Sequence, residues 1–131
     1  MLDFSNEIFN TVAKDLRSLY PGITVIGEYV ETPAKFPAVT IDEIQNIPTN
    51  LDSAVINKYA RVTLRTQTFC NGEGKRSRAR SIFNCVDQKL MNMGFYMKSY
   101  TTTPAIYNAE VYCITATHEA VIGADGTVYR G

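Results

Sequence analysis

The sequence predicts an α+β domain, in which a mostly antiparallel β-sheet of about five or six strands carries two helices packed on one face. Residues 59–95 read as an extended segment, a glycine-bearing turn and an amphipathic helix that lies back over the sheet. The chain before and after this unit reads as strands and one further helix. The composition, 45% hydrophobic and 20% charged over 131 residues, is typical of one globular domain, at residues 1–131.

The chain is predicted to begin with a helix. Apolar residues recur at helical spacing over residues 4–19, and Asp3 or Ser5 can cap the start. Pro21 and Gly22 then end the helix.

Two strands and a long loop are predicted next. Residues 23–30 form a β-branched run, and residues 36–43 form a second strand with Pro37 at its start, where a missing N–H does least harm. Residues 46–55 lack a clean period and are predicted to be an exposed loop, either a binding element or an insertion without a partner. The residues of this loop that we consider for binding are Asn46, Asn50 and Asp52.

The third strand is predicted at residues 58–70. Its alternation directs Ala60, Val62 and Leu64 toward the helix, so Arg61 and Arg65 lie on the opposite face of the sheet. The remaining strands are expected at residues 95–100 and 107–122 and, after a hairpin at Asp125-Gly126, at 127–130.

The second helix follows the turn at residues 71–74. One apolar stripe marks its buried side, and Gly94 occupies the position of a left-handed C-cap. The stripe consists of Ala79, Ile82, Phe83, Val86, Leu90 and Met93. The turn does not fit the GxxxxGK[ST] phosphate loop, so we interpret its glycines as turn formers.

The charge is unevenly distributed although the net charge is zero. Residues 58–80 hold seven basic residues and one acidic residue, a net charge of +6 that the rest of the chain balances. A basic face of this kind meets either nucleic acid or the acidic face of another copy.

Three basic residues begin the second helix, where the helix dipole disfavours cations: Arg76, Arg78 and Arg80. A neighbouring subunit's carboxylates, a nucleic-acid backbone or solvent must therefore accommodate them. The acidic residues considered as partners are Asp42, Glu43, Glu28 and Glu31.

The residues that would support catalysis or metal binding are sparse. Cys70, Cys85 and Cys113 lack the close pairing of zinc ligands and indicate reduced thiols of a cytoplasmic chain, and Cys113 and His118 should point to opposite faces of one strand. His118 is the single histidine, and no nucleophile motif accompanies it. We expect no enzyme activity, cofactor, metal, signal peptide or membrane span.

Nearly the whole chain resembles the tail terminator, or tail completion, proteins of long-tailed phages and prophages. The resemblance rests on the N-terminal helix, the strand at 36–43, the strand ending in residues 69–75, the helix at 79–95 and the hairpin at 121–130. It implies a non-enzymatic virion protein that assembles in the host cytoplasm into a hexameric ring. Such a ring caps the tail-tube protein at the head-proximal end of the tail and meets the head connector protein, and DNA passes through its lumen.

A closed ring requires two unlike, complementary patches on each subunit, which the uneven charge suits. For subunit contact we predict Arg61, Arg65, Arg76, Arg78 and Arg80, with Asp42, Glu43 and the 46–55 loop. An arginine-lined lumen would hold DNA, so at most one or two of the five arginines should face it. Two alternatives remain: a head–tail connector ring, or a cytoplasmic nucleic-acid-binding module that uses the basic segment.

Overall fold

The computed structural model describes residues 5–27, 33, 35–49, 59–105, 108–123 and 128–129. These residues form two helices and six strands. Their order is α1 (Ser5–Leu19), β1 (Thr24–Ile26), β2 (Ala38–Thr49), β3 (Tyr59–Asn71), α2 (Lys75–Asn92), β4 (Tyr96–Ala105), β5 (Asn108–Gly123) and β6 (Val128–Tyr129).

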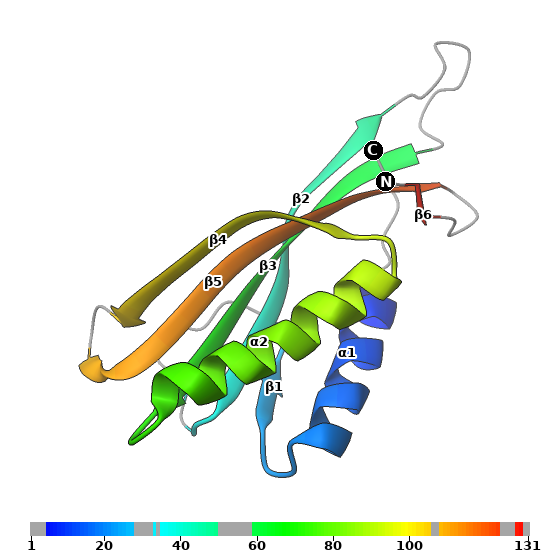
Figure 1. The fold of residues 1–131 in the computed structure, drawn as a ribbon. Coiled ribbons are helices and arrows are strands. Elements are labelled where there is room, and N and C mark those ends of the chain that lie inside the picture. The colour runs from blue at the N-terminus through cyan, green and yellow to red at the C-terminus, as the bar shows by residue number, and fades with distance from the viewer. Residues whose placement is uncertain are drawn as a thin grey trace.

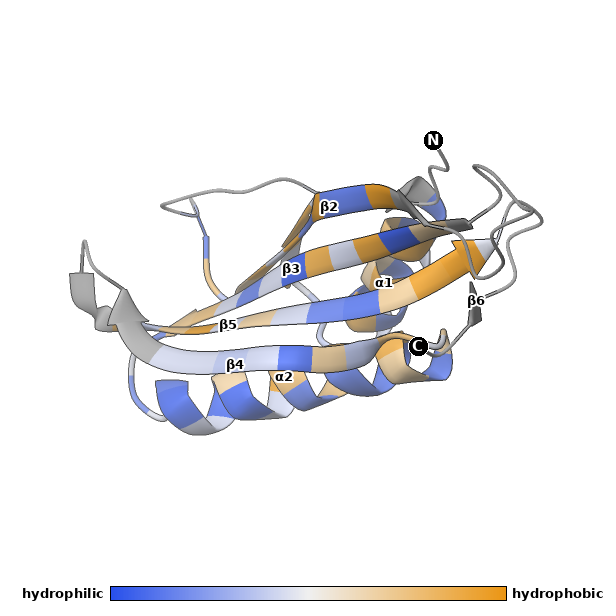
Figure 2. Ribbon diagram, turned by 90° about the horizontal axis from the view of Figure 1, so that it is seen from above, coloured by the Kyte–Doolittle hydropathy of each residue, from blue (hydrophilic) through white to orange (hydrophobic). Residues whose placement is uncertain are grey.

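The strands form one sheet in the order β1-β2-β3-β5-β4, and β6 pairs with β5 (Figure 1). The β1–β2 pair is parallel and all the other pairs are antiparallel. The predicted α+β fold class is therefore confirmed. β3 is the central strand, and its hydrophilic and hydrophobic residues alternate as predicted (Figure 2).

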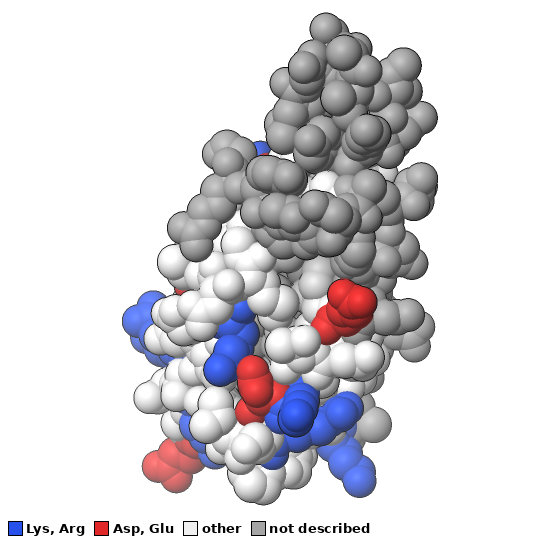
Figure 3. Space-filling view, turned by 90° about the vertical axis from the view of Figure 1, so that its right-hand side faces the viewer, with Lys and Arg blue, Asp and Glu red and all other residues white. Residues whose placement is uncertain are grey.

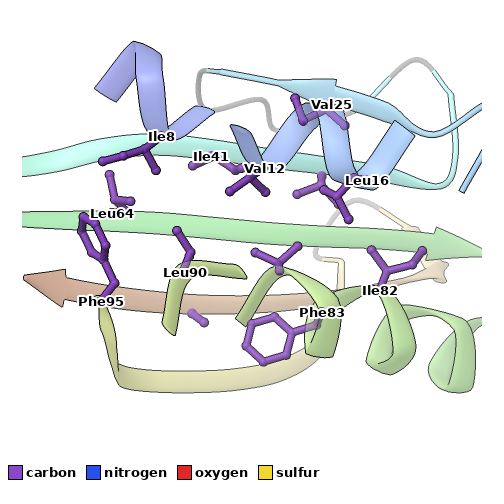
Figure 4. Close-up of a cluster of buried hydrophobic side chains, with 14 of the residues drawn as sticks. Ile8, Val12, Leu16, Val25, Ile41, Leu64, Ile82, Phe83, Leu90 and Phe95 are labelled. Carbon is purple, nitrogen blue, oxygen red and sulfur yellow. The ribbon is translucent and has the colours of Figure 1, made fainter. Parts of the chain in front are cut away.

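Both helices contribute to one hydrophobic core on the same face of the sheet. Val12 and Leu16 of α1 and Val86 and Leu90 of α2 are fully buried, and they pack with Leu64 of β3 (Figure 4). Burying a side chain of this size contributes about 1.5–3 kcal/mol, so this layer dominates the stability of the fold. The opposite face of the sheet has no helix over it within the described residues.

The boundaries of α2 follow from glycines with positive φ. Gly74 precedes the helix at φ 74°, and Gly94 follows it at φ 93°, which confirms the predicted left-handed cap. The Phe95 N–H donates to the Leu90 carbonyl, and the Gly94 N–H donates to the Met91 carbonyl, each at 2.9 Å. These two bonds form a Schellman motif, and Phe95 and Leu90 supply its hydrophobic contact in the core.

The strand boundaries correct three predictions. β2 continues to Thr49, so the first residues of the expected 46–55 loop, Asn46 among them, are strand. A bulge between Glu43 and Gln45 shifts the register there, which is why the sequence shows no clean period. β1 is shorter than predicted, at Thr24–Ile26, and β4 runs past residue 100 to Ala105. Asn50, Asp52, Glu28, Glu31 and the Asp125-Gly126 turn lie outside the described residues.

Candidate interaction face of the sheet

The face of the sheet turned away from the helices carries polar side chains held in cross-strand rows. We call it the open face. Its rows follow the strand register, because residues paired across neighbouring strands direct their side chains to the same side. The open-face residues that interact across strands are Thr40, Asp42, Gln45, Arg61, Thr63, Arg65, Gln67, Tyr96, Lys98, Ser99, Thr117 and Glu119.

One row is centred on an ion pair between β3 and β2. Arg65 lies directly opposite Asp42 in the register. Its Nη2 lies 2.7 Å from Oδ2 of Asp42, and its Nε lies 3.2 Å from Oδ1, so the contact is bidentate. Both side chains are partly shielded, at 31% and 15% exposure. Two residues predicted to meet across a subunit boundary therefore pair within one chain.

A second row is centred on Glu119 of β5, whose side chain is 6% exposed. The Tyr96 hydroxyl donates to its Oε2 at 2.5 Å, Lys98 Nζ lies 3.3 Å away, and Arg61 Nε lies 3.8 Å from Oε1. Burial acts to raise the pKa of Glu119, but the hydrogen bonds from Tyr96 and Lys98 and the two positive charges outweigh it and lower the pKa. The hydrogen bond to Glu119 is also the main cause of a raised pKa of Tyr96.

Short polar side chains fill the remaining positions. Ser99 and Thr117 share a hydrogen bond of 2.7 Å. Thr63 donates to Gln45 at 3.4 Å and Thr40 to Gln67 at 3.3 Å, both across the β2–β3 pair, and these lengths indicate weak bonds. The centre of the open face thus satisfies much of its own charge and hydrogen bonding.

The basic residues of the 58–80 segment divide between two surfaces. Arg61 and Arg65 lie on the open face, whereas Arg76, Arg78 and Arg80 begin α2 and are exposed. Arg78 donates to the Asn71 carbonyl at the end of β3. Arg76 and Arg80 form no ion pair with any residue that the structure describes. Seen from the right of Figure 1, acidic and basic side chains are interspersed rather than gathered by sign (Figure 3).

His118 lies on the helix-covered face of β5. Its side chain is fully buried, and its Nε2 lies 2.7 Å from Oδ1 of Asp87 on α2, whereas its Nδ1 has no partner among the described residues. Sequence reasoning missed Asp87, although its place one turn after Phe83 puts it on the buried side of α2. The expectation that Cys113 and His118 face opposite sides is confirmed, because Cys113 packs with Phe69 in a small cluster on the open face.

A small pocket lies between the start of β2 and the end of β3. It has a volume of about 140 Å³ and is lined by Phe36, Pro37, Cys70, Asn71 and Arg78, whereas small-molecule sites typically occupy about 300–1,000 Å³. Within the described ranges, no three His, Cys, Asp or Glu side chains gather as a metal site would require. Among the same residues, no helix is long and apolar enough to cross a membrane.

The fold and the open face define the chain as a small α+β domain with hydrogen-bonded and ion-paired side chains across one face of its sheet. No protein-family model matches the chain, and no curated protein matches it.

Proposed function

We propose that this protein is a virion structural protein that forms a ring on the end of a phage tail tube, stops tube growth and joins the tube to the head connector. The sequence resemblance to tail terminators is the origin of this proposal, and the helix-on-one-face α+β fold agrees with what the resemblance implies. A head connector ring is the neighbouring alternative within the same class.

The observation that carries the proposal is the charge pairing on the open face. A row of unpaired arginines would hold DNA by its phosphates, with an affinity that depends steeply on salt. Here Asp42 pairs with Arg65, and Glu119 receives both Arg61 and Lys98. A lumen lined by such a face would let DNA pass without retaining it, and it would contain two of the five predicted arginines.

The nucleic-acid-binding alternative has less support. It needs the +6 segment to act as one surface, yet three of its cations are engaged within the chain: Arg61, Arg65 and Arg78. What remains at the start of α2 is Lys75, Arg76 and Arg80.

The first experiment measures the mass in solution by light scattering after size exclusion, over a range of protein and salt concentrations, with and without the cognate tube protein. We expect a hexamer, or a monomer that becomes a ring when tube protein is added. In the same preparation, tubes assembled with this protein should stop growing, as electron microscopy would show. A monomer that ignores tube protein and binds DNA with a steep salt dependence would support the nucleic-acid-binding module instead.

A further inference from the structure

The sheet ends in two unlike edges. On one side, β1 pairs with Ala38–Thr40 of β2, so no described strand lies on the outer side of β2 at positions 41–49. On the other side, β4 has β5 on its inner side and no described strand on its outer side. An unpaired edge of this kind presents backbone N–H and C=O groups that can pair with another chain.

Exposed apolar side chains concentrate on these two strands. Seven large hydrophobic residues are exposed in the described part of the chain, and five of them lie on β2 or β4. They are Ile44 and Ile47 on β2 and Tyr96, Met97 and Tyr100 on β4. Each is between 38% and 46% exposed, so both edges offer apolar area to a partner.

Ile44 on β2 and Tyr96 and Met97 on β4 lie at the same level of the sheet. The register joins Gln45, Thr63, Glu119 and Tyr96 in one row, and Glu43, Leu64, His118 and Met97 in the next. Ile44 sits in the bulge between these rows at the β2 edge. Subunits of a closed ring are related by rotation without a rise, so two contact surfaces at one level suit closure when the strands run along the ring axis.

Strand direction also favours contact between unlike edges. The antiparallel pairs β2–β3, β3–β5 and β5–β4 make β4 run opposite to β2. A rotated copy therefore places its β2 antiparallel to β4, which continues the alternation of the sheet.

We propose that the β2 edge of one copy, at Ile44, packs antiparallel against the β4 edge of the next copy, at Tyr96 and Met97. This inference rests on the ring proposed above and identifies its subunit contact. Bulges at Ile44 and Lys98 interrupt the backbone ladder at both edges, so side chains rather than a continuous strand ladder would make this contact.

Cross-linking tests the contact directly. The double variant Ile44→Cys/Met97→Cys, treated with a short bis-maleimide, should give a ladder of cross-linked species that ends at the ring number. Each single variant should remain monomeric on a denaturing gel, because the two sites meet only between unlike edges. The unmodified protein, with its buried Cys70 and Cys113 and half-buried Cys85, is the control for native thiols. Dimers from either single variant would show two-fold pairing of like edges and overturn the proposal.

Lysine substitutions give an independent readout, since a charge on an edge strand opposes pairing. Ile44→Lys and Met97→Lys should each weaken ring formation about tenfold or more by light scattering. Leu19→Lys is the matched control, because Leu19 is 60% exposed and ends α1, outside both edge strands. If the wild type forms a ring, but the double cysteine variant does not cross-link and the edge lysines do not weaken the ring, this inference fails and the ring proposal stands. If the wild type stays monomeric with tube protein present, both fail.

Discussion

Glu119 shows how a charged side chain can be nearly buried on a sheet face that no described helix covers. Its carboxylate accepts from Tyr96 and lies beside Lys98 and Arg61, so its neighbours replace the water that burial removes. The sequence alone gave no sign of this cluster, because Tyr96 and Lys98 come from β4, which is joined to Glu119 only by the strand register.

We expect Glu119→Gln to lower the free energy of unfolding by about 1–3 kcal/mol at pH 7, because charge-assisted hydrogen bonds are lost. The folded-state pKa of Glu119 is below its ordinary value of 4.5, so its contribution is present above that value and is lost as the pH falls through the folded pKa. Urea unfolding of variant and wild type from pH 7 to pH 3 should therefore show a difference that shrinks toward acid. A difference independent of pH would contradict this assignment.

The His118–Asp87 pair is expected to be structural. Asp87→Ala removes the partner of a fully buried Nε2 and should cost about 1–3 kcal/mol in unfolding free energy. The double variant Asp87→Ala/His118→Leu should cost less than the sum of the two single changes, because it leaves no orphaned ring nitrogen. Denaturant unfolding of all four proteins measures the coupling, and strictly additive costs would argue against the pair.

At the scale of elements, the sequence predicts what depends on local pattern. The stripe of α2 and the alternation of β3 were read correctly, because burial imposes a period on each. The ends of β2 and β4 were predicted wrongly, because bulges in these two edge strands break the period. Pro48 and Pro104 near their ends also resemble loop residues. Asp42, Arg61 and Arg65 were identified as site residues, whereas Glu119 and Lys98 were missed. Which of these charges pair depends on the register between distant segments, which periodicity does not reveal.

The C-terminus of α2 offers a test at this scale. Gly94→Ala should destabilise the protein by about 1 kcal/mol, because a Cβ is strained at φ 93°. Asn84→Ala, at an exposed site within the same helix, is the control and should change the unfolding free energy by less than about 0.5 kcal/mol. Equal effects of the two substitutions in thermal or urea unfolding would contradict the role of the cap.

At the scale of the whole molecule, the paired charges of the open face and the exposed arginines of α2 predict different salt responses. We expect Arg76→Glu to weaken ring closure, since Arg76 forms no ion pair with a described residue and a neighbouring copy's carboxylates can accommodate it. Light scattering from low to high salt should show this variant less sensitive to salt than the wild type. Arg17→Glu, an exposed base in the last turn of α1, is the control.

The two unlike edges of the sheet have a consequence for mixtures of normal and defective subunits. In the ring proposed above, a growing arc would always have one β2 edge and one β4 edge open, and only the last subunit to enter would join both. A copy with one damaged edge could be added to an arc by its intact edge but could not be extended at the damaged one. Such a copy would terminate assembly of the arc. A small fraction of Met97→Lys subunits would therefore reduce the yield of closed rings by more than that fraction.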